Sequence, residues 1–155
     1  MKVLLVDDEP FILQGLSVLI DWAAEGCEIV KMASNGKEAL LYLEDHEADL
    51  VITDIKMPVM SGLELLEQIR GRQISDAFFI ILSGYNDFSY AQKAIRYACM
   101  DYLVKPVQKE ALLELIRKAK SSLAVTEQNA ENERRMQEMQ LYYCTFTGKA
   151  ERRGA

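Results

Sequence analysis

Five short apolar runs alternate along this chain with five segments whose apolar residues recur every three or four positions. We expect the apolar runs to be buried strands and the segments between them to be helices. The expected strands are residues 2–6, 28–33, 50–53, 78–82 and 102–104. The expected helices are residues 10–22, 36–45, 62–70, 87–98 and 108–123. This alternation predicts an α/β domain with a parallel sheet covered on both faces.

Composition narrows the class of protein. The chain has 155 residues, half of them hydrophobic, which is enough for one globular domain and an extension. No apolar run approaches the ~18 residues of a membrane span, and acids follow the first strand at once, so we expect neither membrane contact nor a signal peptide. Three cysteines far apart predict neither a metal site nor a disulfide framework, so we expect a cytoplasmic protein. A net charge of −6 argues against direct nucleic-acid binding.

The composition changes after Leu123. Residues 126–140 are polar and rich in good helix formers, and their apolar positions Ala130, Met136 and Met139 do not keep a strict heptad. Residues 141–146 then form an apolar cluster. We therefore expect one domain at residues 1–123, followed at 124–155 by a helical linker and the truncated start of a further region.

Polar side chains follow four of the five expected strands. Asp7 and Asp8 come after the first strand, Asp54 after the third, Ser83 after the fourth and Lys105 after the fifth. Because the carboxyl ends of parallel strands lie along one edge of a sheet, we expect these side chains to converge there.

The expected cluster has a definite chemistry. Three neighbouring carboxylates repel one another unless a cation lies between them, and oxygen ligands without histidine or cysteine suit Mg²⁺. The ammonium of Lys105 and the hydroxyl of Ser83 would stabilise charge on a transferring phosphoryl group, with Asp54 as the nucleophile.

Each of these features also has a simpler explanation. Asp54 alone could just end a strand, Asp7 and Asp8 could form a solvated turn, Ser83 could belong to a turn, and Lys105 could precede a helix. The shared position after strands, repeated four times, favours the functional interpretation.

These residues carry a family resemblance. The segments Asp7–Glu9, Asp54 with Met57, Pro58 and Gly62, Ser83–Gly84 and Asp101–Pro106 resemble the receiver domain of bacterial two-component response regulators. The resemblance covers about residues 1–123. It implies a flavodoxin-like fold, a three-layer sandwich with five helices and a five-stranded parallel sheet of order 2-1-3-4-5.

The resemblance implies specific roles at the acidic edge. Asp54 would accept a phosphoryl group from a sensor histidine kinase. Mg²⁺ would be held by Asp8, Asp54 and the backbone carbonyl of Lys56, with Asp7 assisting.

It also implies a conformational switch. Ser83 and Lys105 would hold the phosphoryl oxygens, and Tyr102 would turn inward when Ser83 moves toward the phosphate. The peptide bond between Lys105 and Pro106 is expected to be cis. The face of the fourth helix, fifth strand and fifth helix would then favour a homodimer.

A narrower likeness concerns residues 83–91, which are similar to receivers attached to AraC-type transcription regulators. Such regulators carry their DNA-binding domain at the far C-terminus, so this segment would reach DNA only through a domain it lacks. Two departures from the family are Ala98, where glycine is common, and Ser83, where threonine is common. Lys56 and Tyr85 occupy positions that tune phosphate lifetime, and we expect slow self-dephosphorylation.

Two other functions stay open. The chain could be a phosphate-independent receiver that acts as a dimerisation module, although the complete acid set argues against this. It could be a phosphatase with an aspartyl nucleophile, but such enzymes want a second aspartate where Lys56 stands. We expect no enzyme activity beyond its own phosphotransfer and dephosphorylation.

Overall fold

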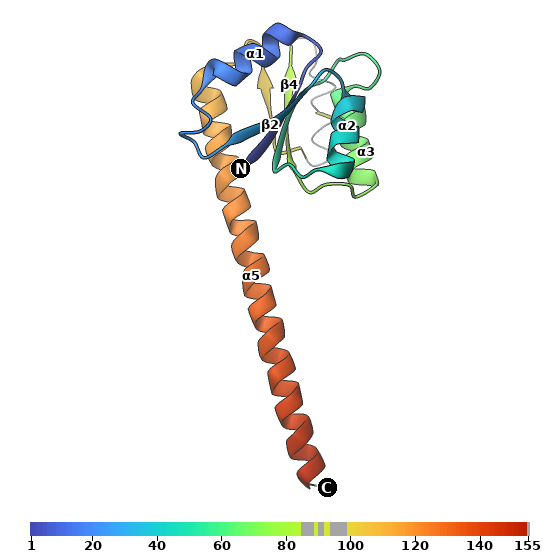
Figure 1. The fold of residues 1–155 in the computed structure, drawn as a ribbon, viewed down its shortest axis with the longest axis vertical. Helices are drawn as coiled ribbons and strands as arrows, with labels where there is room; N and C mark the ends of the chain where they lie inside the picture. The colour runs from blue at the N-terminus through green and yellow to red at the C-terminus, as the bar shows by residue number, and fades with distance from the viewer. Residues whose placement is uncertain (85–88, 90–91, 94–98, 155) are drawn as a thin grey trace. The chain divides into compact units, whose positions relative to one another are not determined.

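The structure is a computed structural model that describes residues 1–84, 89, 92–93 and 99–154, with side chains up to residue 139 (Figure 1). The elements are β1 (Lys2–Val6), α1 (Pro10–Leu19), β2 (Glu28–Ala33), α2 (Gly36–Asp45), β3 (Leu50–Asp54), α3 (Gly62–Gly71), β4 (Phe78–Ser83), β5 (Asp101–Val104) and α5 (Lys109–Gly154). The alternation of strands and helices agrees with the pattern predicted from the sequence.

The five strands form one parallel sheet in the order β2-β1-β3-β4-β5, which confirms the flavodoxin-like prediction. β3 lies at the centre and every one of its residues is buried, as expected for a continuous apolar strand. Val6 pairs with Thr53, Asp54 with Leu82, and Ser83 with Val104. These registers align the carboxyl ends of four strands and so position the candidate site.

Helices cover both faces of the sheet (Figure 1). One core contains Leu40 of α2 and Leu66 of α3, and the other contains Leu16 of α1 and Ile116 of α5. Successive residues of β4 alternate between the two cores, because side chains on a strand point to opposite faces in turn. The first core takes Phe79 and Ile81, and the second takes Ile80 and Leu82.

Side-chain hydrogen bonds cap the starts of two helices. Asn35 Oδ1 accepts a hydrogen bond from the backbone N–H of Glu38 at 2.9 Å and caps α2. Ser61 Oγ accepts one from the backbone N–H of Glu64 at 3.1 Å and caps α3.

The end of α1 differs from the prediction. The helix ends at Leu19 instead of continuing to Trp22. Trp22 is buried in the following turn, where its indole N–H donates to the carbonyl of Leu16 at 3.0 Å. Packing of this side chain against the sheet therefore ends a helix that apolar periodicity alone would extend.

The helix expected at residues 87–98 falls mostly outside the described residues. Of that range only Ser89, Gln92 and Lys93 are described, and they are helical. The expectations for Tyr85, Asp87 and Ala98 lie outside the described residues. The part of the chain that is described thus contains four of the five expected helices.

The chain divides into two compact units, Met1–Lys120 and Ser121–Ala155. Helix α5 contributes its first turns to the first unit and all of its remaining turns to the second. Within the described residues no helix is long and apolar enough to cross a membrane.

Candidate functional site

The ammonium of Lys105 lies between two buried carboxylates at the carboxyl edge of the sheet. Its Nζ is 3.0 Å from Asp7 Oδ2 and 3.1 Å from Asp54 Oδ2. Asp7 is fully buried and Asp54 nearly so. The parallel topology brings together groups from the ends of β1, β3 and β5, which are far apart in the sequence.

The two carboxylates are oriented by the backbone. Asp54 Oδ1 accepts a hydrogen bond from the N–H of Ile55 at 2.8 Å, and Asp7 Oδ1 accepts one from the N–H of Glu9 at 2.9 Å. Each acid therefore keeps one oxygen on a backbone donor and turns the other toward Lys105.

Lys105 is itself held at the end of β4. Its backbone N–H donates to the carbonyl of Ser83 at 2.8 Å, and the bond between Lys105 and Pro106 is cis, as the resemblance predicted. Ser83 is buried and directly follows Leu82, the strand partner of Asp54. The structure therefore places Ser83 and Lys105 at the same edge as the acids.

Asp8 completes an acidic cluster. One carboxylate oxygen from each of Asp7, Asp8 and Asp54 lies within 4.8 Å of the others, and Asp8 is exposed. A group of carboxylate oxygens open to solvent on one side is a donor set that fits a hard divalent cation such as Mg²⁺. The prediction that these three acids converge is correct.

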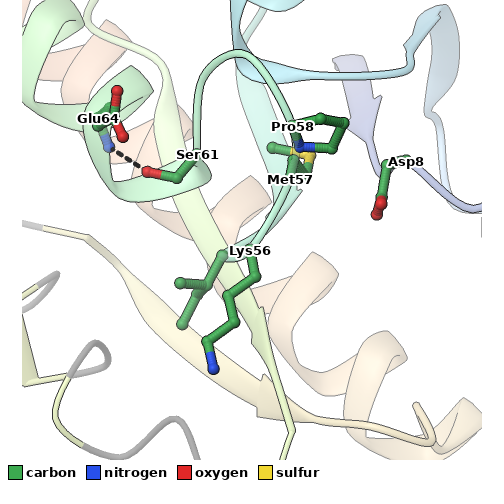
Figure 2. A pocket seen from close by; sticks show the side chains of 7 residues that line it. Asp8, Lys56, Met57, Pro58, Ser61 and Glu64 are labelled. Carbon is green, nitrogen blue, oxygen red and sulfur yellow. Dashed lines mark hydrogen bonds between the residues drawn. The ribbon is translucent and has the colours of Figure 1, made fainter.

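A pocket of about 390 Å³ adjoins this cluster, and Asp8 belongs to both (Figure 2). The loop between β3 and α3 provides its other walls, with Ile55, Lys56, Met57, Pro58 and Ser61, together with Glu64. The side chain of Lys56 points away from Asp8 in this view. The pocket therefore lies beside Asp8, the exposed member of the acidic cluster.

The electrostatics of the site follow from burial. Burial and the neighbouring charge of Asp7 raise the pKa of Asp54, against the opposing effect of Lys105. Burial by itself lowers the pKa of Lys105, but its hydrogen bond to Asp7 and the charge of Asp54 outweigh this, and its pKa is raised. Lys105 therefore stays charged. Its one positive charge does not fully compensate for the desolvation and mutual repulsion of the two buried carboxylates, because the pKa of Asp54 is still raised. A further cation would be favoured at this edge.

Tyr102 does not join the cluster. It pairs with Ile81 in the sheet and is 40% exposed, on the same side of β5 as the exposed Val104. Leu103 between them is buried. The predicted switch residue thus has its ring directed outward from the core.

Two glycines, Gly62 and Gly36, have a packing role that was not predicted from the sequence. A Cβ on Gly62 would overlap the backbone carbonyl of Asp54, and one on Gly36 would lie 2.6 Å from the carbonyl oxygen of Met60. Both glycines are the first residue of a helix, where glycine brings no gain in helix propensity. A glycine at such a position is the sequence feature that could have indicated a close backbone contact.

Comparison with known proteins agrees with this geometry. Residues 3–117 match the model of the response regulator receiver domain. The chain is 39% identical over 112 residues to the uncharacterized transcriptional regulatory protein YesN of Bacillus subtilis strain 168, covering 72% of this chain and 30% of that protein.

Solved structures of response regulator receiver domains also resemble this chain. The receiver domain of AraT, a response regulator from Geobacillus stearothermophilus, is 39% identical, with a TM-score of 0.75 over 81% of this chain and 97% of that one. A two-component transcriptional regulator AraC from Clostridium phytofermentans is 28% identical, with a TM-score of 0.74 over 82% of this chain and 98% of that one. The predicted likeness to receivers of AraC-type regulators is confirmed.

The fold and the edge site thus define a signalling module. The chain belongs to the response regulator receiver domain family. It spans 30–46% of the length of the first curated relatives that it matches, which are named as transcriptional or response regulatory proteins.

Proposed function

We propose that this domain is a phosphoacceptor switch in which Asp54 receives a phosphoryl group from a histidine of a sensor kinase. The observation that carries the proposal is the bridging of Asp54 and Asp7 by the ammonium of Lys105, beside the exposed carboxylate of Asp8. This arrangement combines an oriented nucleophile, a fixed positive charge and a metal-binding donor set.

In the proposed reaction a carboxylate oxygen of Asp54 attacks phosphorus, and the bond from phosphorus to the kinase histidine nitrogen breaks. Asp7, Asp8, Asp54 and the backbone carbonyl of Lys56 would hold Mg²⁺, which supplies positive charge beside the phosphoryl oxygens when bound. Lys105 contributes a further positive charge, 3.1 Å from Asp54 Oδ2. Positioning and charge stabilisation then account for the transfer.

The switch would begin at Ser83 and Lys105, whose backbones are hydrogen-bonded to each other. Both side chains would bind phosphoryl oxygens, and movement of Ser83 would make room for Tyr102 to rotate from its exposed position. The face of β5 and the first turns of α5, joined by the ion pair of Asp101 and Lys118 at 3.4 Å, would be remodelled as a result.

We infer that the output is transcriptional control through a DNA-binding domain in the part of the protein that follows this segment. The names of the longer relatives and of the AraC structure support this inference. Phosphorylation would favour a homodimer through the β5 and α5 face.

The test is direct. The chain is incubated with a small phosphodonor and Mg²⁺, with and without a chelator, and its intact mass is measured. We expect a single phosphoryl adduct that requires the metal, is lost in Asp54→Asn and is retained in the control Asp45→Asn at the far end of α2. An adduct that persists in Asp54→Asn, or no adduct under any condition, would overturn the assignment.

A further inference from the structure

Among the side chains of the second unit that the structure describes, up to residue 139, three large apolar ones of α5 are exposed. Val125, Met136 and Met139 are 59%, 65% and 71% exposed, although each belongs to a residue type that usually packs against something. Met136 and Met139 are three positions apart, and Val125 precedes Met136 by eleven. Steps of three and eleven both fit the spacing of the inward positions of a heptad repeat.

Polar residues complete this series. Between residues 122 and 139, the inward heptad positions that are not apolar are occupied by Ser122, Asn129 and Asn132. Ala130 lies outside the series, which is why the apolar residues alone show no regular heptad. In the sequence, Tyr143 and Phe146 continue the same spacing.

Little within the helix compensates for this exposure. The described side-chain contacts of the second unit are local pairs one turn apart: Thr126 with Ser122, Gln128 with Asn132, and Arg135 with Glu131. Pairs of this kind on an exposed helix contribute little, and a lone helix is marginal in water. We therefore expect the helix to pack against another helix along the side that carries the heptad series.

We propose that residues 121–146 pair with the same residues of a second copy of this chain as a parallel, two-stranded coiled coil. An asparagine at an inward position specifies register and a two-stranded state at some cost in stability, and here Asn129 would face its own counterpart.

The flanking charges are compatible with this parallel register. Gln128 would face Glu133 of the second copy, and Arg135 would face Gln140 of the second copy, so no like charges meet.

The antiparallel alternative is disfavoured by the ends of the series. Placing Val125 opposite Met136 in an antiparallel pair would set Tyr143 opposite Lys118 and Phe146 opposite Leu115. Leu115 is already buried in the core of the first unit. Only the parallel arrangement lets every apolar residue of the series meet an apolar residue.

We expect this pairing to be weak, because two successive inward positions, Asn129 and Asn132, are polar. A second contact between the same two chains would strengthen it by raising the effective concentration. Phosphorylation-dependent contact between the receiver units would be such a contact. This last link rests on the proposed function, whereas the coiled coil itself does not.

Disulfide trapping tests the pairing and its orientation. In a background where Cys27, Cys99 and Cys144 are alanine, single variants Val125→Cys, Met139→Cys and the outward-facing control Arg134→Cys are oxidised mildly without phosphodonor. We expect Val125→Cys and Met139→Cys each to form a covalent homodimer at least tenfold faster than Arg134→Cys. Equal rates for all three would overturn the proposal. A further variant, Met136→Cys, tests the other orientation, and cross-linking only in a mixture of Val125→Cys and Met136→Cys would show the antiparallel pair and would also overturn the proposal.

Sedimentation equilibrium provides a second measurement in the native-cysteine chain. Asn129→Val should tighten the dimer at least tenfold, and Met136→Glu should weaken it to the same extent. Circular dichroism and unchanged phosphoryl-adduct formation would show that the variants are folded. If neither variant changed the dissociation constant while both stayed folded, the pairing would be wrong and the phosphoacceptor assignment would be unaffected.

Discussion

Gly62, the first residue of α3, packs directly against the backbone carbonyl of Asp54, the last residue of β3. The N–H of Gly62 also donates to the carbonyl of Ile55 at 2.8 Å. The loop from Ile55 to Ser61 therefore leaves the sheet and returns to it beside the candidate phosphoacceptor. A side chain at Gly62 therefore has no room unless the backbone of Asp54 moves.

Gly62→Ala is expected to destabilise the domain by about 1–3 kcal/mol, because the new methyl group must displace the Asp54 backbone. It should also slow formation of the phosphoryl adduct. Gly15→Ala is the matched control, since a Cβ at Gly15 in the exposed middle of α1 meets nothing within 4 Å. That substitution should be neutral or stabilising by up to about 1 kcal/mol. Urea unfolding of both variants measures the difference, and equal midpoints would contradict the packing argument.

Lys105→Met is expected to destabilise the metal-free domain by about 1–3 kcal/mol, because it leaves Asp7 and Asp54 buried without their shared cation. Asp54→Asn removes one of the repelling charges and should recover much of this loss in the double variant. A double-mutant cycle from chemical denaturation in chelator gives the coupling energy. Simple additivity of the two substitutions would show that the ion pair is energetically unimportant.

Mg²⁺ is expected to stabilise the chain if Asp7, Asp8 and Asp54 bind it. At ten times the dissociation constant the gain in unfolding free energy would be about 1.4 kcal/mol. Asp8→Asn should abolish most of that gain while leaving the metal-free stability nearly unchanged, because Asp8 is exposed. Asp45→Asn should keep the full response. Unfolding curves with Mg²⁺ and with chelator measure this stabilisation. If Mg²⁺ still stabilised Asp8→Asn to the same extent, that result would argue against this metal site.

Glu38 should make the start of α2 sensitive to acid. Its pKa is lowered chiefly because its carboxylate accepts a hydrogen bond from the backbone N–H of Ser34, with help from Lys31 at 3.3 Å. A carboxyl whose pKa is lower in the folded state contributes stability above its unfolded pKa and loses it as pH falls through the folded pKa. Glu38→Gln should therefore cost stability at neutral pH, and that cost should disappear as the pH falls through the lowered pKa of Glu38.

Chemical denaturation across this pH range measures the effect. Glu47→Gln, at an exposed glutamate in the loop before β3, is the control and should leave the free energy of unfolding at neutral pH nearly unchanged. A cost for Glu38→Gln that stays constant with pH would mean that the side chain acts through packing and not through its charge.

Much of this protein is readable from the sequence because the relevant interactions are local. The apolar runs of the strands, the cap of α2 at Asn35 and the cap of α3 at Ser61 depend on residues within one turn or one strand. The polar residues after four strands predicted the acidic edge, because parallel topology requires strand ends to converge.

Contacts between distant segments were decided only by the tertiary structure. The end of α1 at Leu19 depends on Trp22 packing into the core, and the fit of Gly62 against Asp54 depends on how a loop returns to the sheet. The sharing of Lys105 between Asp7 and Asp54 links residues 98 positions apart at one edge. The sequence by itself thus determined which residues reach the edge of the sheet. Folding decided their partners, because hydrogen bonds and ion pairs form only between groups that packing brings within about 3 Å.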